Sequence, residues 1–307
     1  MKPLIEQAIE RTQPAPSGHG AFQWPPKADV PAAQPVSRPI EIRLPHPFVE
    51  SVETELLGRT GIAFDRWAQQ TGWVRDRADR YCWRCAGSIG AHETDGEGCA
   101  TCRTISLPWD RAIRLSKYQK TIRQEVLMLK FGAWRPTGRG LGMHLGLAIK
   151  DQLSTAQIPA DQVVLVPIPM HWRRRMIRGI DHTLILARAA ARSSGCRVDQ
   201  LLHARLRNEQ VGLSKTARAR NMKNAFFLTK FDRGRVKKSM AQNRRLFIMI
   251  DDVRTTGATF VSASKALKTA FSDEFGGNSM QGQGAEIWTA CVGVAGETRR
   301  EVGESEG

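Results

Sequence analysis

Short apolar runs alternate with helical stretches through the second half of the chain. "VVLVPIP" at 163–169 is β-branched and bounded by prolines, 246–250 is an unbroken apolar run, and 286–294 is a third apolar segment. Helical apolar spacing follows the first run at 183–193 and the second at about 258–271. Strands buried on both faces read as such continuous runs, and their alternation with helices predicts a parallel sheet covered on both faces. We therefore expect an α/β domain with right-handed crossovers.

Local signals mark further elements of this domain. Ile122, Val126 and Leu129 have helical spacing, as do the apolar residues of 141–149. Asp181 can cap the start of the helix at 183–193, and Gly195 can end it. These signals predict helices before and after the strand at 163–169.

The composition of the chain indicates its partners only broadly. Lys and Arg number 46 against 30 Asp and Glu, which leaves a net charge of +16. Such a field attracts nucleic acid, phosphate-rich metabolites or an anionic membrane surface, although solvated Arg-rich helices give the same count. No stretch approaches the roughly 18 apolar residues of a membrane span, and residues 1–20 lack a secretory h-region, so we expect a cytoplasmic protein without a membrane span.

Four cysteines form a C-x2-C-x13-C-x2-C pattern: Cys82, Cys85, Cys99 and Cys102. Each pair can present two thiolates to one tetrahedral ion, and cytoplasmic thiols stay reduced, so structural zinc is expected. The alternative is a set of unmetallated cysteines or a redox pair. His92 lies between the pairs and either replaces a ligand or is solvated. Cys196 and Cys291 are isolated and are expected to be buried as small apolar residues.

The string "LFIMIDDVRTTGATF" predicts a ligand site. A buried strand leads into Asp251 and Asp252, then a short loop, then a helix, and open α/β proteins bind ligands at the carboxyl ends of their strands. Gly257 allows close backbone approach, and threonine hydroxyls and the helix N-terminus can donate to phosphate. The acids can accept hydrogen bonds from vicinal hydroxyls or face Mg²⁺ through water. The alternative is that the acids only end the strand and the threonines only form a turn.

Three other segments bear on the site. "MHWRRRMIRGIDH" follows the strand at 163–169 and is either a second ligand loop or a solvated basic helix start. The polar stretch 207–226 is typical of a lid or binding loop. The glycine-rich stretch 138–146 lacks the spacing and the preceding strand of a dinucleotide site, and no P-loop sequence occurs.

The string at 251–259 resembles the phosphoribosyl-diphosphate signature of the type I phosphoribosyltransferases. The resemblance implies that Asp251 and Asp252 hold the ribose hydroxyls. It implies that the 5′-phosphate is held by Thr255, Thr256, Gly257, Ala258 and Thr259. Arg254 stands where that family has an apolar or small residue, and it either contacts pyrophosphate or faces solvent.

The chain from about 81 to 294 resembles the ComF family of competence-associated phosphoribosyltransferase-like proteins. The resemblance rests on the cysteine ribbon, "YQKTIRQEVLMLKFG", "VPIPMHWRRRMIRG" and the loop residues Gln210, Leu213, Arg218, Asn221 and Phe226. It implies that pyrophosphate is held by Met170, His171, Arg173 and Arg174. It also implies a closing flap that contains Gln210, Arg218 and Asn221. The family's Gly-Phe-Asn-Gln is replaced by Gly179, Ile180, Asp181 and His182, so a base or partner contact at that point is expected to differ.

The resulting expectation is a type I phosphoribosyltransferase-like α/β fold in a chain of five regions. These are a disordered Pro-rich extension at 1–50, a helical lead-in at 51–77, a zinc ribbon at 78–106, the phosphoribosyltransferase-like domain at 107–298 and a polar tail at 299–307. The protein is expected to bind phosphoribosyl diphosphate with Mg²⁺ and to transfer ribose 5-phosphate to a nitrogen acceptor. The alternative is a non-catalytic or weakly catalytic protein that binds single-stranded DNA and competence or recombination proteins during DNA uptake. No histidine lies in a motif that identifies it as a general base.

Overall fold

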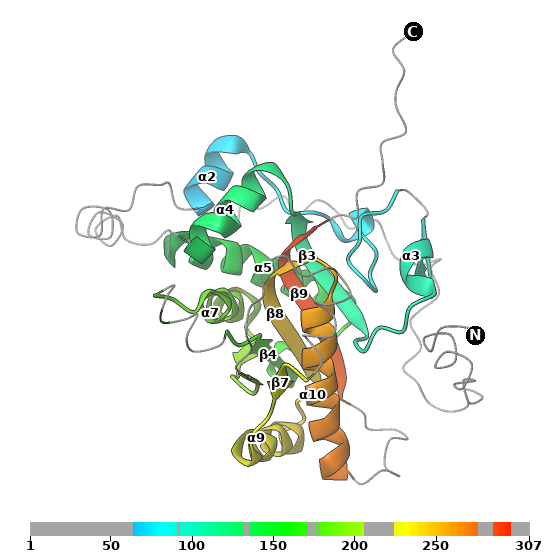
Figure 1. The fold of residues 1–307 in the computed structure, drawn as a ribbon. Helices are drawn as coiled ribbons and strands as arrows, with labels where there is room; N and C mark the ends of the chain where they lie inside the picture. The colour runs from blue at the N-terminus through cyan, green and yellow to red at the C-terminus, as the bar shows by residue number, and fades with distance from the viewer. Residues whose placement is uncertain are drawn as a thin grey trace, which may run out of the picture.

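A five-stranded parallel sheet lies at the centre of the computed structural model (Figure 1). The structure describes residues 64–90, 93–131, 135–170, 176, 179–205, 224–275 and 285–295. In spatial order the strands are β3 (Arg111–Lys117), β9 (Glu286–Val294), β8 (Leu246–Arg254), β4 (Val163–Pro167) and β5 (Arg197–Val198). All neighbouring pairs run parallel, so the carboxyl ends of the five strands share one edge. The predicted α/β fold with a parallel sheet is confirmed.

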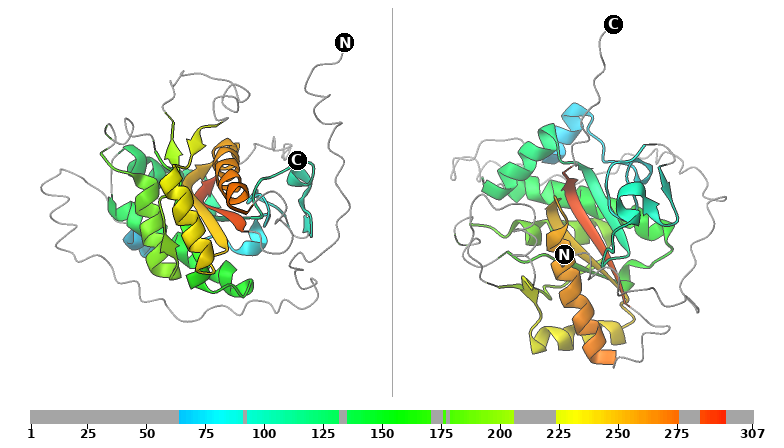
Figure 2. Two further views of the ribbon diagram at one scale, coloured as in Figure 1. Left: turned by 90° about the horizontal axis from the view of Figure 1, so that it is seen from below. Right: turned by 45° about the vertical axis from the view of Figure 1, so that its right-hand side comes forward.

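Helices cover both faces of this sheet (Figure 2). On one face lie α2 (Phe64–Thr71), α4 (Lys120–Phe131), α5 (Arg135–Thr155) and α7 (His182–Ser194). On the other lie α9 (Lys230–Ala241), α10 (Ala258–Phe275) and the short strand β7 (Phe226–Phe227), which pairs with β6 (His203–Ala204). Along β8, Ile248 and Ile250 pack toward the first layer, while Phe247 and Met249 pack toward the second. No described helix combines the length and apolar character needed to cross a membrane.

The helix α7 begins and ends as the sequence predicts. Asp181 Oδ1 accepts a hydrogen bond from Leu184 N at 3.1 Å, and Gly195 ends the helix in the left-handed region at φ 79°. Thr183 Oγ1 donates to Ile168 O at 2.7 Å. This bond ties the first turn of α7 to the end of β4, and so fixes α7 at the carboxyl edge of the sheet.

A stripe of glycines lets α5 and α7 pack closely. Gly138, Gly142 and Gly146 recur every four residues on α5 and are all buried. A Cβ on Gly142 would lie 2.6 Å from Ala189 Cβ, and one on Gly146 would lie 2.7 Å from Ala190 Cα. Because residues four apart share one face of a helix, the glycine-rich stretch serves helix packing.

The strand β3 has no apolar run in the sequence, because Arg111 and Arg114 interrupt it. Arg114 is 1% exposed and is nevertheless satisfied, since its guanidinium lies 2.7 Å from Asp76 Oδ2 and donates to Ala86 O at 3.0 Å. It also lies over the Tyr81 ring, 5.2 Å from its centroid. Arg114 therefore connects the sheet to the cysteine-bearing segment that precedes it.

Two expected boundaries were wrong. β8 continues to Arg254, so Asp251 and Asp252 belong to the strand and do not follow it. Phe226, expected in a polar loop, lies in β7 and is only 8% exposed. In both places backbone pairing with a neighbouring strand extends the ordered element beyond the apolar run that marks it in the sequence.

Candidate functional site

The two adjacent acids at the end of β8 point to opposite faces of the sheet. Asp251 is the register partner of Cys291, which packs in the cluster on the α10 side. Asp252 contacts residues of α4 and α7 on the other face. Successive strand residues alternate between faces, which accounts for this divergence. Only Asp251 therefore shares its side of the sheet with the loop that leads into α10.

Asp252 is held by two basic side chains from distant parts of the chain. Its Oδ2 lies 2.9 Å from Lys130 Nζ at the end of α4 and 2.8 Å from His182 Nε2 at the start of α7. Asp252 is 3% exposed and His182 is 6% exposed. Both contacts fall on Oδ2, and a carboxylate has a second oxygen that can accept hydrogen bonds.

The surroundings shift the pKa values of Asp251 and Asp252 in opposite directions. Burial, followed by the charge of Asp252, raises the pKa of Asp251 to about 8. Burial alone would also raise the pKa of Asp252, but the hydrogen bond from His182 and the charge of Lys130 outweigh it and lower that pKa. One carboxylate is thus held ionised beside one that readily carries a proton.

This pair predicts a pH dependence of stability. Between its ordinary pKa of 3.8 and about 8, Asp251 keeps a proton in the folded state that it loses in the unfolded state. The unfolded state then binds fewer protons, so the free energy of unfolding should fall as pH rises through this window. Urea denaturation at pH 5 and pH 8 measures the fall. Asp251→Asn should reduce it and the exposed-site control Asp161→Asn should not; an equal fall in all three proteins would contradict the assignment.

The loop between β8 and α10 has a geometry that suits an anion. Gly257 adopts φ +78°, Thr255 and Thr256 are exposed, and α10 begins at Ala258. Among the described residues, the buried Nε of Arg254 has no hydrogen-bond partner. The loop thus brings exposed hydroxyls, the N-terminus of α10 and an unsatisfied guanidinium nitrogen to one end of the sheet.

Four buried thiols converge in the segment before the sheet. The sulfurs of Cys82, Cys85, Cys99 and Cys102 all lie within 4.8 Å of one another. The Sγ–Sγ distance is 3.6 Å for Cys82–Cys102 and 3.7 Å for Cys85–Cys99, and a tetrahedral zinc with bonds of about 2.3 Å holds sulfurs about 3.8 Å apart. The cluster could therefore hold a metal ion. The contacts between the thiols also shift their pKa values. A hydrogen bond from Cys85 lowers the pKa of Cys82 to about 4, and the same contact raises the pKa of Cys85, so Cys82 is the thiol that ionises more easily.

The backbone around these thiols is braced by side chains. The hairpin of β1 (Thr94–Asp95) and β2 (Gly98–Cys99) leads into the short helix α3 (Ala100–Arg103). Arg84 Nη1 donates to Glu97 O and to Cys102 O, each at 3.0 Å. Gly98 has φ +111°, and a Cβ there would lie 2.6 Å from Cys102 Sγ. The hairpin thus needs glycine next to Cys99 to bring the second pair of thiols to the first.

The other predicted ligand residues divide into those inside and those outside the described part of the chain. Met170 follows β4, at the same edge of the sheet as Asp251. Cys196 and Cys291 are buried, at 7% and 2% exposure, as expected. Outside the described residues lie His92, His171, Arg173, Arg174, Gln210, Leu213, Arg218 and Asn221.

Sequence reasoning missed the roles of Lys130 and His182. Lys130 lies in the "LKF" stretch that contributes to the family resemblance, and His182 occupies one of the positions that depart from it. Their contacts to Asp252 span 122 and 70 residues along the chain. The signal available in the sequence was a basic residue near the end of one predicted helix, Lys130, and at the start of another, His182.

The fold and its two candidate sites define an α/β protein with a candidate ligand site at the carboxyl edge of a parallel sheet and a four-cysteine cluster before the sheet. The chain is 27% identical over 190 residues to Competence protein F of Haemophilus influenzae, which covers 61% of this chain and 78% of the relative. It is 29% identical over 175 residues to DNA utilization protein YhgH of Escherichia coli K12, covering 55% and 70%, and 29% identical over 199 residues to the Salmonella typhimurium protein of that name, covering 63% and 80%. No protein-family model matches the chain. The relatives confirm the resemblance to the ComF family.

Proposed function

We propose that the carboxyl edge of the sheet binds phosphoribosyl diphosphate. The observation that carries the proposal is the placement of Asp251 and Asp252 at the end of β8, two residues before the Thr255–Gly257 turn that leads into α10 at Ala258. A sugar phosphate has hydroxyls that bind carboxylates and a phosphate that binds amides and hydroxyls. Along this part of the chain the carboxylates come first, and the hydroxyls and helix amides follow. The unsatisfied Arg254 Nε supports an anionic ligand over a neutral one.

Each side chain has a role in this proposal. By resemblance, Asp251 and Asp252 are assigned to the ribose hydroxyls; because the two acids face opposite sides of β8, the ribose would lie across the carboxyl end of the strand, where both are within reach. Lys130 and His182 hold Asp252 ionised. Thr255, Thr256, Gly257, Ala258 and Thr259 hold the 5′-phosphate. The diphosphate, accompanied by Mg²⁺, is assigned by resemblance to Met170, His171, Arg173 and Arg174, and the closing flap to Gln210, Arg218 and Asn221.

The reaction that such a site supports is transfer of ribose 5-phosphate to a nitrogen nucleophile. The bond from C1′ to the diphosphate oxygen breaks and diphosphate leaves with the electron pair. The nitrogen forms the new bond to C1′ and releases its proton. Fixing the phosphate away from C1′ lets binding energy orient the reacting carbon.

Calorimetry of the full chain with phosphoribosyl diphosphate and Mg²⁺ tests the proposal. Asp251→Ala and Thr256→Ala should each weaken binding about tenfold, since each removes a side chain that hydrogen-bonds the ligand, and a partner left unsatisfied costs about 1–3 kcal/mol. Thr269→Ala is the control, because Thr269 is exposed further along α10. Absence of heat in the wild type, or equal heats in all variants, would refute the site. Pyrophosphate release with a panel of bases then tests turnover.

We also propose that the four-cysteine cluster holds structural zinc. Four thiolates complete a tetrahedral shell and leave no position for a reactive water. The sulfur separations and the burial of all four cysteines support zinc, as does the family resemblance. The six cysteines are all free, which supports a reducing, cytoplasmic location.

A second candidate function is a role in DNA uptake or utilisation. It is favoured by the names of the relatives, which include Competence protein F and DNA utilization protein YhgH. The net charge of +16 suits contact with a polyanion. In this role the protein binds single-stranded DNA and acts with competence or recombination proteins.

A further inference from the structure

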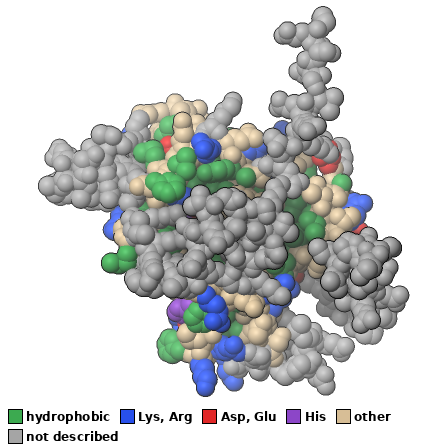
Figure 3. Space-filling model, viewed as in Figure 1, with side chains coloured by type: hydrophobic (Ala, Val, Ile, Leu, Met, Phe, Trp, Pro, Cys, Tyr) green, Lys and Arg blue, Asp and Glu red, His purple; other side chains and the backbone are tan. Residues whose placement is uncertain are grey.

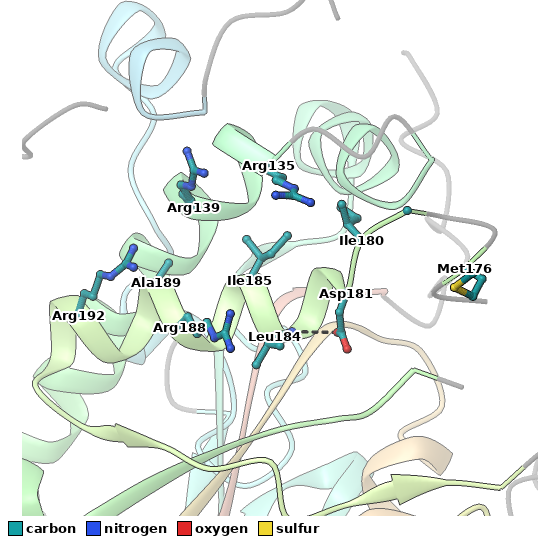
Figure 4. Close-up of a pocket in the computed structure, with 11 residues that line it drawn as sticks. Arg135, Arg139, Met176, Ile180, Asp181, Leu184, Ile185, Arg188, Ala189 and Arg192 are labelled. Carbon is teal, nitrogen blue, oxygen red and sulfur yellow. Dashed lines mark hydrogen bonds between the residues drawn. The ribbon is translucent and has the colours of Figure 1, made fainter. Parts of the chain in front are cut away.

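A basic groove lies between α5 and α7, outside the phosphoribosyl site. Its cavity has a volume of about 510 Å³ and is lined by Arg135 and Arg139 from α5 and by Arg188 and Arg192 from α7. Figure 4 shows these arginines coming from the two helices, with Ile185 between them. None of the residues of the Asp251–Thr259 segment lines the groove.

In the part of the chain that the structure describes, none of the four guanidinium groups forms an ion pair with a carboxylate. Asp181 is the acidic residue in the lining, and its Oδ1 accepts from Leu184 N and from Thr183 Oγ1. Because Asp181 is engaged in capping α7, it does not neutralise the arginines, and the groove carries a net positive charge.

The arrangement of the arginines follows from the helix packing. Each pair is spaced four residues apart, which puts its members on one side of a helix with about 6 Å between them along the axis. The glycine stripe, which contacts Ile185 and Leu186 among others, brings the two pairs together across the groove. Like charges at this spacing are mutually destabilising, so the cluster does not exist for the stability of either helix.

A second basic surface shows the opposite pattern. Figure 3 shows Lys and Arg side chains gathered over α9, at the lower end of that face. There, Arg235 pairs with Asp199 and with Asp232, so part of the α9 charge is neutralised within the protein. The charge of the two surfaces alone does not show which one binds a polyanion. The groove is favoured because its arginines are not paired with carboxylates among the described residues.

We propose that the α5–α7 groove binds the phosphate backbone of a single-stranded nucleic acid. The inference rests on the DNA role proposed above and assigns it a surface. Guanidinium groups bind phosphate oxygens in bidentate fashion, and a basic groove that tracks the backbone is the usual device for binding single strands without sequence preference. A rigid duplex cannot enter a cavity of about 510 Å³, whereas a flexible strand can. The apolar side chains of Leu184 and Ile185 would contact sugars and bases without reading them.

Fluorescence anisotropy with a labelled single-stranded oligodeoxynucleotide, titrated at several salt concentrations, tests this proposal on the full chain. Four phosphate contacts predict a slope of log K against log salt of about −2.8, and Arg188→Gln/Arg192→Gln should reduce it to about −1.4. The same variant should weaken binding about tenfold. Lys230→Gln/Lys238→Gln on α9 removes equal charge from exposed positions on the other face and should leave affinity unchanged. An RNA strand of the same sequence should bind through the same arginines, and a duplex should bind more weakly than the single strand.

The failures of the two proposals are distinguishable. If the wild type binds no single strand, the DNA role fails and the groove assignment with it. If the wild type binds but the α7 variant binds equally well, or both variants lose affinity equally, only the groove assignment is overturned. Binding of phosphoribosyl diphosphate should be unchanged in the α7 variant, because the phosphoribosyl site shares no residue with the groove.

Discussion

Removing the metal from the four-cysteine cluster is expected to unfold the segment around residues 81–105 while the sheet stays folded. The cluster formed within this segment consists of the four cysteines, with Ile89 and Leu107 partly buried against it, while Tyr81 and Ala86 pack into the core on the α10 side of the sheet. So small a core cannot offset the entropy of ordering the hairpin, whereas zinc binding to such modules contributes about 10–16 kcal/mol at pH 7. Hydrogen exchange before and after chelation should show loss of protection in this segment and retained protection in β8 and β9.

A cysteine substitution gives the same test without a chelator. Cys99→Ser should abolish stoichiometric zinc, measured by elemental analysis, and should raise exchange in the hairpin as chelation does. Cys196→Ser alters a buried but isolated thiol and should leave the zinc content unchanged. Full protection of the hairpin in zinc-free protein would show that its contacts to Trp83 and Arg84 are sufficient to order it.

The parts of the fold that the sequence predicted are those in which burial and residue type agree. β4, residues 246–250 of β8 and most of β9 are apolar because both faces are covered, and α7 carries its own Asp181 cap and Gly195 stop. β3 was missed because two of its buried residues are arginines. Their charges are satisfied by groups far away in the chain, such as Asp76 and Gln152, which no local pattern records.

The candidate sites divide in the same way. Local spacing predicted the four cysteines, and the structure brings them together. The loop at 251–259 was also recognised from local order, but the opposite orientation of its two acids depends on strand register and on helix ends. His182 illustrates the difference: the sequence marked it only as a departure from the family, while the fold places it 2.8 Å from Asp252.

Gly146→Ala is expected to destabilise the protein by about 1–3 kcal/mol or more, the cost of overpacking a core contact. The new Cβ would lie 2.7 Å from Ala190 Cα and would also meet Ala190 O, which is backbone and cannot rotate away. The helices would have to separate, and Ser193 Oγ, which donates to Met143 O at 2.8 Å, would lose its bond across the interface. The free energy of unfolding, measured in urea, should fall accordingly.

Gly234→Ala is the matched control, because Gly234 lies within α9 and a Cβ there would have no neighbour within 4 Å. Alanine is a better helix former than glycine, so this variant should gain about 0.5–1 kcal/mol of stability. The two substitutions are chemically identical, and their opposite signs would isolate the close approach of α5 and α7 as the cause. A Gly146→Ala protein as stable as Gly234→Ala would show that the helices can separate freely. In that case the spacing of the four groove arginines would not be fixed by the glycine stripe.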